Sequence, residues 1–420
     1  AASILLIPLV LVDRDSCPCT ASFYNVFYMS QEFDVVVVGS GGAGMVAALT
    51  AAHHGLSTVV VEKAPHYGGS TARSGGGVWI PNNEVLRRDG VSDTPEAART
   101  YLHGIVGDVV PAEKIDTYLQ RGPEMLSFVC KNSPLKLCWV PNYSDYYPEA
   151  PGGRPGGRSV EPKPFDARRL GEDMDGLEPP YGKVPLNVVV MQQDYVRLNQ
   201  LKRHPRGVLR SLKVGARTMW AQARHKNLVG MGRALIAPLR VALRQAGVPV
   251  LLNTELTDLY VEDSVVRGIY VRDTNAPEDA EPRLIQARRG VILCSGGFEH
   301  NEAMRHKYQS DSLGDHESLG ADSNTGEAIR AAAYASLASF YQVAAEYDVR
   351  MVDKAQTRTT VATVIATFGM SGTALCATTK TMASCADGSS ASSECKPSHR
   401  CPPSSAALAL YPMDPVYWPV

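Results

Sequence analysis

The chain has 420 residues, which is long enough for two domains and a large buried core. Its 44% hydrophobic and 20% charged residues are typical of a soluble globular protein, and no apolar run has the length needed to span a bilayer. Because the formal net charge is −1, the composition gives no reason to expect nucleic acid as a partner.

Residues 1–30 differ from the sequence that follows them. They do not begin with Met, and Met29 stands just before the first predicted strand. Residues 3–12 resemble the apolar part of a signal peptide, but no basic segment precedes them and no small-residue cleavage site clearly follows. We therefore interpret residues 1–30 as a non-native or upstream leader, and we expect a cytoplasmic protein.

Residues 33–63 have the pattern of a complete dinucleotide-binding unit. The apolar run 35–38 predicts a strand, and a glycine-rich turn follows it without a gap. Small apolar residues at 45–52 predict a closely packed helix, and the β-branched residues at 58–61 predict a second strand. This order predicts an α/β fold with a Rossmann-type parallel sheet, in which phosphates lie at the helix N-terminus.

The glycine turn and the acid after the second strand have separate physical functions. Gly39 allows the tight turn, Gly41 lets the backbone approach a pyrophosphate, and Gly44 lets the helix pack closely on the strand. Glu62 stands at the end of the second strand, where a carboxylate can accept hydrogen bonds from ribose hydroxyls. In this unit, we predict dinucleotide contacts from Gly39, Ser40, Gly41, Gly42, Ala43, Gly44, Glu62 and Lys63.

A second glycine-rich loop at 68–77 favours FAD over NAD, because its amides and hydroxyls can surround the pyrophosphate and flavin of a longer ligand. Ordinary turns are the alternative explanation of these glycines. Together with segments 289–298 and 324–327, the loop resembles the flavoprotein subunits of the fumarate reductase and succinate dehydrogenase superfamily. The resemblance implies FAD and adds to its site Gly69, Ser70, Thr71, Ser74, Gly75, Gly76, Gly77, Gly296, Asn324 and Thr325.

The middle of the chain contains a strongly basic segment. No Asp or Glu occurs between Tyr195 and Thr254, whereas Lys and Arg are frequent there, and residues 208–220 mix apolar and basic side chains at roughly helical spacing. Two interpretations stay open. A solvated helix or loop is the more common use of such a pattern, and peripheral contact of residues 197–226 with an anionic membrane surface is the alternative.

An aromatic loop at 139–154 places Tyr143, Tyr146 and Tyr147 among prolines and glycines. Such a loop can line a flat apolar pocket, and a tyrosine offers a hydroxyl there without the desolvation cost of a charged group. The alternative is that the three tyrosines are half-buried packing residues with satisfied hydroxyls.

From Met29 to about Ala333 the chain resembles the actinobacterial 3-ketosteroid delta-1-dehydrogenases (3-oxosteroid 1-dehydrogenases). The residues that carry this resemblance are segments 68–90, 99–108, 144–158 and 230–240. The family takes part in steroid catabolism and inserts a double bond between carbons 1 and 2 of a 3-ketosteroid. A hydride passes from carbon 1 to FAD, a proton passes from carbon 2 to a tyrosinate, and an external electron acceptor reoxidises the flavin.

The resemblance implies a catalytic role for Tyr146, as the tyrosine that assists the proton-abstracting one, and Tyr147 is the alternative assignment. The proton-abstracting tyrosine and the groups that polarise the ketone lie in the family's second half, and nothing after Tyr334 matches those motifs. The catalytic domain is therefore expected to be truncated or replaced. The sequence leaves open a related steroid delta-4 dehydrogenase or fumarate reductase-like enzyme, and an inactive, truncated FAD-binding product.

The expected organisation has three parts. Residues 1–30 are the leader, residues 31–333 form the FAD-binding domain with a helical and loop insertion at about 95–245, and residues 334–420 form an unrelated tail. Ser, Ala, Thr, Cys and Pro dominate residues 370–407, which favours a frameshifted, disordered tail. The cysteines of the body are too scattered for a metal site, so we predict no metal and a reducing compartment.

Overall fold

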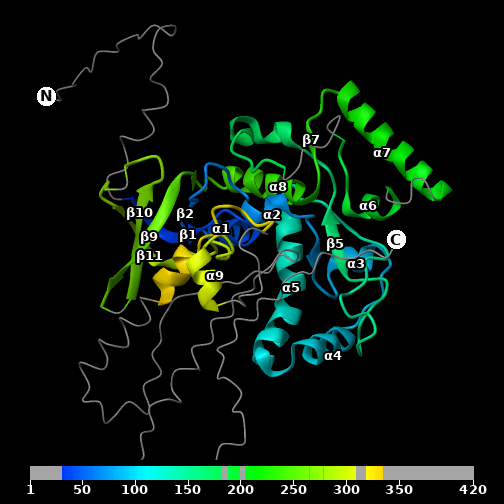
Figure 1. Ribbon diagram of the computed structural model, residues 1–420, viewed down its shortest axis with the longest axis horizontal. Helices are drawn as coiled ribbons and strands as arrows, with labels where there is room; N and C mark the ends of the chain where they lie inside the picture. The colour runs from blue at the N-terminus through cyan, green and yellow to red at the C-terminus, as the bar shows by residue number, and fades with distance from the viewer. Residues whose placement is uncertain are drawn as a thin grey trace, which may run out of the picture.

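The computed structural model describes residues 31–180, 188–198, 204–263, 265–277, 279–308 and 318–333. The leader and the tail lie outside these residues, so the expectations about them stay predictions. The described part is a mixed α/β fold built around one large sheet (Figure 1).

The large sheet has six strands, of which four are parallel and two form an antiparallel hairpin at one edge. In spatial order the strands are β8 (Val250–Leu251), β2 (Thr58–Val61), β1 (Gln31–Val38), β11 (Arg283–Leu293), β10 (Val265–Asp273) and β9 (Thr254–Glu262). β1 and β2 coincide with the two strands that the apolar runs predict, and β1 begins a few residues earlier. The predicted α/β fold with a parallel sheet is therefore confirmed.

Both faces of the central strands are buried, which explains why their sequences are continuously apolar rather than alternating. On one face, Val35 and Val37 pack with residues of α1 (Gly42–His53) and α8 (Met231–Gln245). On the other face, Val36 and Val38 pack with hairpin residues and with Ala328. The core thus covers both faces of the sheet.

The chain between β2 and β8 contains most of the helices and two small antiparallel sheets. The smaller sheets are β3 (Val78–Trp79), β5 (Ser159–Pro162) and β4 (Leu137–Trp139), and β6 (Phe165–Asp166) with β7 (Leu228–Val229). The helices are α2 (Gly69–Arg73), α3 (Glu84–Arg88), α4 (Pro95–Val106), α5 (Ala112–Asn132), α6 (Gln192–Leu198), α7 (Pro205–Ala223) and the 3₁₀ turns Gly107–Val109 and Ala167–Met174.

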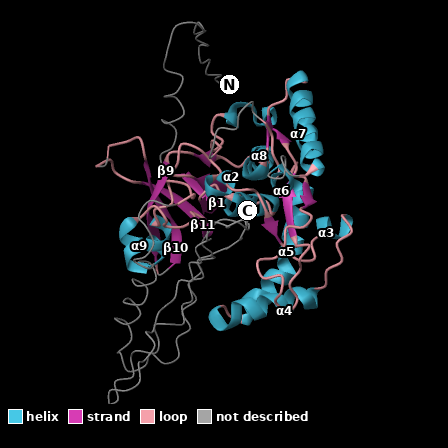
Figure 2. Ribbon diagram, turned by 45° about the vertical axis from the view of Figure 1, so that its right-hand side comes forward, coloured by secondary structure: helices cyan, strands magenta, loops and turns pink. Residues whose placement is uncertain are grey.

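The two halves of the described fold lie on opposite sides of α1 and α2. Figure 2 shows α3 to α7 on one side, and β9 to β11 with α9 (Glu302–Tyr308) on the other. The short strands β3 to β7 were not predicted, because two- to four-residue strands have no readable periodicity. None of the helices in the described ranges is long and apolar enough to cross a membrane.

Candidate functional site

The first glycine loop lies where β1 ends, against the loop that follows β11. The backbone N–H of Cys294 donates to the carbonyl of Val38 over 2.7 Å. Gly39 has a φ of +99°, and a Cβ on it would lie 2.3 Å from the carbonyl oxygen of Cys294. Only glycine fits this tight turn, as the sequence predicts.

The start of α1 is open for an anion. A Cβ on Gly44 would lie 1.9 Å from the carbonyl oxygen of Gly39, so the helix packs directly on the turn. Gly41, in contrast, has no atom closer than 3.6 Å to the position of a Cβ. α1 has no side-chain cap and no acidic residue in its first turn, so its N-terminal N–H groups and the helix dipole favour a phosphate. One of these N–H groups, that of Gly42, donates to Thr71 Oγ1 over 3.1 Å.

Glu62 and Ser40 join the first two loops. Glu62 Oε2 accepts hydrogen bonds from Ser40 N at 2.9 Å and Ser40 Oγ at 2.5 Å, and Glu62 Oε1 accepts from Ala64 N at 2.9 Å. Ser40 Oγ also accepts from Gly68 N at 3.1 Å. Glu62 is buried, and these bonds hold its carboxylate at the end of β2. A carboxylate has further lone pairs, so it can still accept from a ribose hydroxyl.

Ser70 and Asn324 join the second loop to the segment before residue 333. Ser70 Oγ accepts from Asn324 Nδ2 at 3.0 Å and from Ala321 N at 2.9 Å. A Cβ on Gly296 would lie 2.6 Å from Asn324 Oδ1. The same Asn324 amide donates to Glu299 Oε1 over 2.7 Å, whereas Glu299 Oε2 is buried without a hydrogen-bond partner among the described residues. The predicted site residues Ser70, Gly296 and Asn324, which come from three separate motifs, therefore lie together in the structure.

Lys63 binds the same segment through its ammonium group. Lys63 Nζ donates to Thr325 Oγ1 over 2.5 Å and pairs with Glu327 Oε1 at 2.8 Å. Burial raises the pKa of Glu327, but the hydrogen bonds from Lys63 and Thr325 outweigh it, and the pKa lies below its ordinary value. In this structure Lys63 thus ties β2 to residues 325–327.

Two residues that shape the second loop were missed by the sequence analysis. A Cβ on Gly232 of α8 would lie 1.9 Å from the carbonyl oxygen of Thr71, and the Gly232 N–H donates to Ser74 O over 2.9 Å. A Cβ on Gly75 would lie 2.9 Å from Gln192 Oε1. Gln192 belongs to no motif, whereas the closely spaced glycines at 230 and 232 are a signal of close packing that the sequence does contain.

Gln192 also connects the second glycine loop to the aromatic loop. Its side chain hydrogen-bonds to the hydroxyl of Tyr143, and its backbone N–H donates to Glu161 Oε2 over 2.6 Å. Glu161 is fully buried, and burial raises the pKa of its carboxyl group. The side chain of Gln192 therefore contacts both the second glycine loop, which is predicted to bind the cofactor, and the aromatic loop, which is predicted to line the substrate pocket.

Tyr146 and Tyr147 are exposed rather than half-buried, with 64% and 50% of their surface accessible. Although the residue as a whole is exposed, desolvation around its hydroxyl, together with Tyr143 and Tyr101 nearby, raises the pKa of Tyr146 to about 12. The phenol is thus neutral at physiological pH and can donate a hydrogen bond. Its catalytic role stays a prediction.

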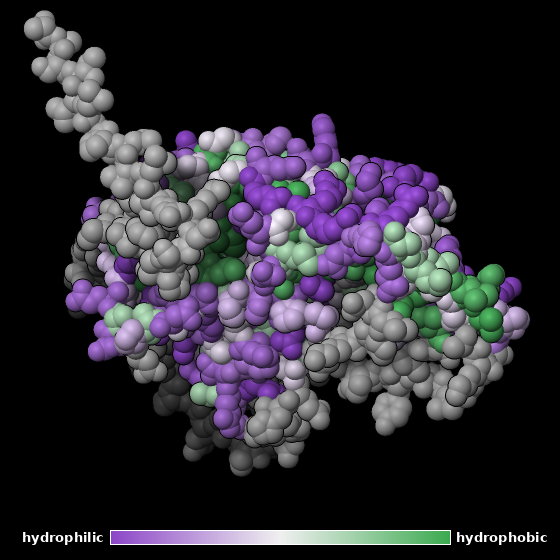
Figure 3. Space-filling view, turned by 90° about the horizontal axis from the view of Figure 1, so that it is seen from above, coloured by the Kyte–Doolittle hydropathy of each residue, from purple (hydrophilic) through white to green (hydrophobic). Residues whose placement is uncertain are grey.

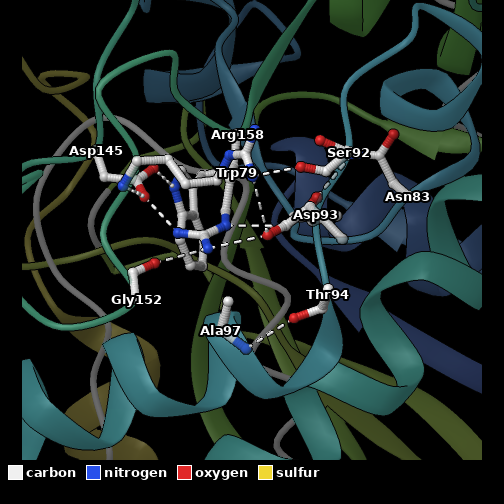
Figure 4. Close-up of polar contacts among 11 residues, drawn as sticks. Trp79, Asn83, Ser92, Asp93, Thr94, Ala97, Asp145, Gly152 and Arg158 are labelled. Carbon is white, nitrogen blue, oxygen red and sulfur yellow. Dashed lines mark hydrogen bonds and ion pairs between the residues drawn. The ribbon is translucent and has the colours of Figure 1, made fainter.

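A buried ion network holds the backbone that carries Tyr146 (Figure 4). Asp145 accepts a hydrogen bond from Trp79 Nε1 at 2.8 Å and pairs with Arg158. Arg158 makes a two-pronged pair with Asp93, at 2.9 and 3.0 Å, and donates to Gly152 O over 2.8 Å. Since both carboxylates are paired and hydrogen-bonded, the network fixes the loop without leaving a buried charge unpaired.

The described residues contain no group of three or more His, Cys, Asp or Glu side chains that could hold a metal ion. Burial raises the pKa of the Cys294 thiol to about 12 and the pKa values of Cys130 and Cys138 to about 11. Protonated thiols of this kind are poor nucleophiles.

Comparison with known proteins identifies the class. The family model described as FAD binding domain matches residues 34–400, and the chain belongs to this family. The match continues beyond Ala333, into residues outside the described part. FAD is thus confirmed as the cofactor of the family. The site fits it through the uncapped start of α1, the open space at Gly41 and the unpartnered oxygen of Glu299.

Particular relatives refine this class. The chain is 79% identical over 308 residues to a 3-oxosteroid 1-dehydrogenase of Mycolicibacterium smegmatis, covering 73% of this chain and 54% of the relative. A 4-oxocyclohex-2-ene-1-carboxylate 5-dehydrogenase of Sinomonas cyclohexanicum is 35% identical, covering 67% and 48% of the two chains. The crystal structure of the 3-ketosteroid delta1-dehydrogenase of Sterolibacterium denitrificans, in complex with 1,4-androstadiene-3,17-dione, has a TM-score of 0.65 and 34% identity, covering 73% and 55%. The predicted resemblance is confirmed, and the chain spans about half the length of these relatives.

Proposed function

We propose that the chain is an FAD-dependent oxidoreductase that introduces a 1,2 double bond into the A-ring of 3-ketosteroids. The observation that carries this proposal is the 79% identity over 308 residues to a 3-oxosteroid 1-dehydrogenase. The site supports it, because three loops with dinucleotide-binding chemistry adjoin a loop rich in tyrosine.

Each part of FAD would be bound by a different loop of the described residues. The N–H groups at the start of α1 would bind the pyrophosphate, and Glu62 would bind a ribose. The second loop, from Gly69 to Gly77, and residues 324–325 would surround the rest of the cofactor. When bound, FAD supplies the acceptor for the hydride that leaves carbon 1 of the steroid.

Tyr146 would act through its hydroxyl group. A phenol whose pKa is about 12 keeps its proton at neutral pH, so Tyr146 is suited to donate a hydrogen bond and not to act as the base. Such a donor can stabilise a neighbouring tyrosinate that removes the proton from carbon 2.

The proposed partners are a 3-ketosteroid and an external electron acceptor. The steroid class is supported by the dione bound in the Sterolibacterium denitrificans relative. We place the protein in the cytoplasm and propose that residues 197–226 contact a membrane peripherally, which would suit a lipophilic substrate.

The cyclohexene carboxylate dehydrogenase relative supports a second candidate, oxidation of a smaller cyclic ketone. The sequence also leaves room for a steroid delta-4 dehydrogenase, a fumarate reductase-like enzyme or an inactive FAD-binding product. A small dicarboxylate would need a cluster of Arg and His side chains near the flavin. The aromatic loop around Tyr143 and Tyr146 instead suits a flat apolar ring.

An anaerobic absorbance titration of the purified 420-residue chain with 4-androstene-3,17-dione tests the proposal. Bleaching of the oxidised flavin band is the expected result, because a 3-ketosteroid would then have delivered a hydride to FAD. A flavin band that stays unbleached by the steroid but bleaches with the smaller cyclic ketone would favour the second candidate. A flavin band that neither substrate bleaches would indicate an inactive chain that only binds FAD.

A further inference from the structure

Helix α7 turns an apolar stripe away from the rest of the protein. Its buried residues recur at intervals of seven, four and three positions, so they lie on one helical face: Gly207, Val214, Thr218 and Ala221. The opposite face carries the exposed apolar side chains Val208, Leu209, Leu212, Met219 and Trp220. Leu209, Leu212 and Met219 are 69%, 66% and 70% exposed, which is unusual for three large apolar residues on one helix.

The surrounding surface agrees with an outward-facing helix. α7 lies at the outer rim of the described fold, beside α6 (Figure 1). Figure 3 shows hydrophobic residues gathered at the same end of the molecule, next to strongly hydrophilic ones. Among the described residues, α7 therefore lies at the edge of the fold with its apolar stripe facing outward.

Positive charge flanks the stripe on one side. Arg206 and Lys213 stand three residues before and four residues after Leu209, so they adjoin it on the helix surface. Just after the helix, the charged groups of Arg224 and Lys226 lie 4.8 and 4.5 Å from the centroid of the Trp220 ring. An aromatic ring with cations beside it suits the boundary between lipid headgroups and acyl chains.

Negative charge is scarce near this surface. No Asp or Glu occurs in the sequence between Tyr195 and Thr254. Asp194 of α6 is the carboxylate that meets α7, and it is paired with Arg210 and Arg217 at 2.6 Å each. Arg206 and Lys213 form no ion pair with a described carboxylate, so their charge is available to an anionic partner.

We propose that the outward face of α7 docks on a membrane of anionic lipids, with Leu209, Leu212 and Met219 entering the boundary between headgroups and acyl chains. The basic flank then contacts the headgroups. A second copy of the chain is a poorer occupant, since a symmetric contact would bring two basic flanks together. The inference rests on the membrane contact proposed above and is independent of dehydrogenase activity.

Co-sedimentation of the full chain with vesicles tests this inference. We expect binding to vesicles of phosphatidylglycerol and phosphatidylcholine, weak binding to phosphatidylcholine alone, and loss of binding as salt screens the charges. Lys213→Glu should lower the partition coefficient about tenfold, because it reverses one cationic contact. The double variant Leu209→Glu and Leu212→Glu should abolish binding, whereas Val109→Glu, at a residue that is 60% exposed elsewhere, should leave it unchanged.

Two further measurements make the result unambiguous. Vesicles should shift the tryptophan emission to shorter wavelength, and Trp220→Phe should remove this shift. Circular dichroism of each variant checks that the fold is retained. The inference is overturned if all variants bind the vesicles equally or if vesicle binding does not depend on the charge of the lipids. It is also overturned if the α7 variants abolish self-association of the chain and not vesicle binding. Vesicle binding without steroid oxidation would refute the proposed activity and leave this inference standing.

Discussion

At the scale of single residues, Arg158 shows how one buried cation can organise a loop. Its guanidinium pairs with Asp93 and Asp145, and the side chains of all three residues are at most 2% exposed. The guanidinium also lies 5.6 Å from the centroid of the Tyr101 ring, whose hydroxyl accepts a hydrogen bond from Tyr147 N at 3.2 Å. Side chains far apart in the sequence thus fix the backbone on both sides of Tyr146.

We expect Arg158→Leu to destabilise the protein by about 3–5 kcal/mol, because it leaves the buried Asp145 without its cation and Asp93 with only the longer contact to Arg154, at 3.8 Å. Urea denaturation followed by circular dichroism measures this loss in the free energy of unfolding. Arg168→Leu is the matched control, since Arg168 is half exposed and pairs with Asp166 at 2.6 Å on the surface. Equal losses for the two variants would contradict a structural role of the buried network.

At the scale of elements, the close packing of α8 on α2 determines the shape of the second glycine loop. We expect Gly232→Ala to cost about 1–3 kcal/mol of stability and to lower the flavin content, because its Cβ would lie 1.9 Å from the carbonyl of Thr71. The ratio of flavin to protein absorbance and the urea midpoint measure the two effects.

Gly104→Ala in α4 is the control for this prediction. No atom lies within 4 Å of the position of its Cβ, so the added methyl group meets no neighbour. Alanine also has the higher helix propensity, and this variant should keep its flavin and lose no stability. If Gly232→Ala retained its flavin as well as this control does, the packing of α8 would not shape the loop.

Local patterns predicted β1, β2 and the glycine turn between β1 and α1. The apolar runs of the two strands and the closely spaced Gly39 and Gly44 stand near one another in the sequence, so they can be recognised without knowledge of the fold. Contacts between distant segments were not predictable in this way. Gln192 is recognisable only once α6 lies beside Gly75, and Arg158 only once two separate aspartates surround it. The exposure of Tyr146 likewise depends on packing, which spacing does not encode.

At the scale of the whole molecule, the candidate site is assembled from three stretches of chain that lie far apart in the sequence. These stretches are residues 39–44, residues 68–77, and residues 294–308 with 318–327. Among the described residues, the hydrogen bonds that join them run chiefly through Ser40, Ser70, Thr71 and Asn324. A ligand that contacts all three stretches links both sides of the fold. Binding to the folded state alone then stabilises the whole protein.

We therefore expect FAD to stabilise the folded chain as a whole and to protect all three stretches together. At a free concentration of about 100 times its dissociation constant, FAD should add about 2.7 kcal/mol to the free energy of unfolding. Thermal unfolding of flavin-free protein with and without FAD measures this gain. Hydrogen exchange should slow in all three stretches at once, whereas NAD at the same concentration should change neither quantity. Protection confined to residues 39–44 would show instead that the cofactor contacts only the first loop, and that the second and third stretches belong to the site by proximity alone.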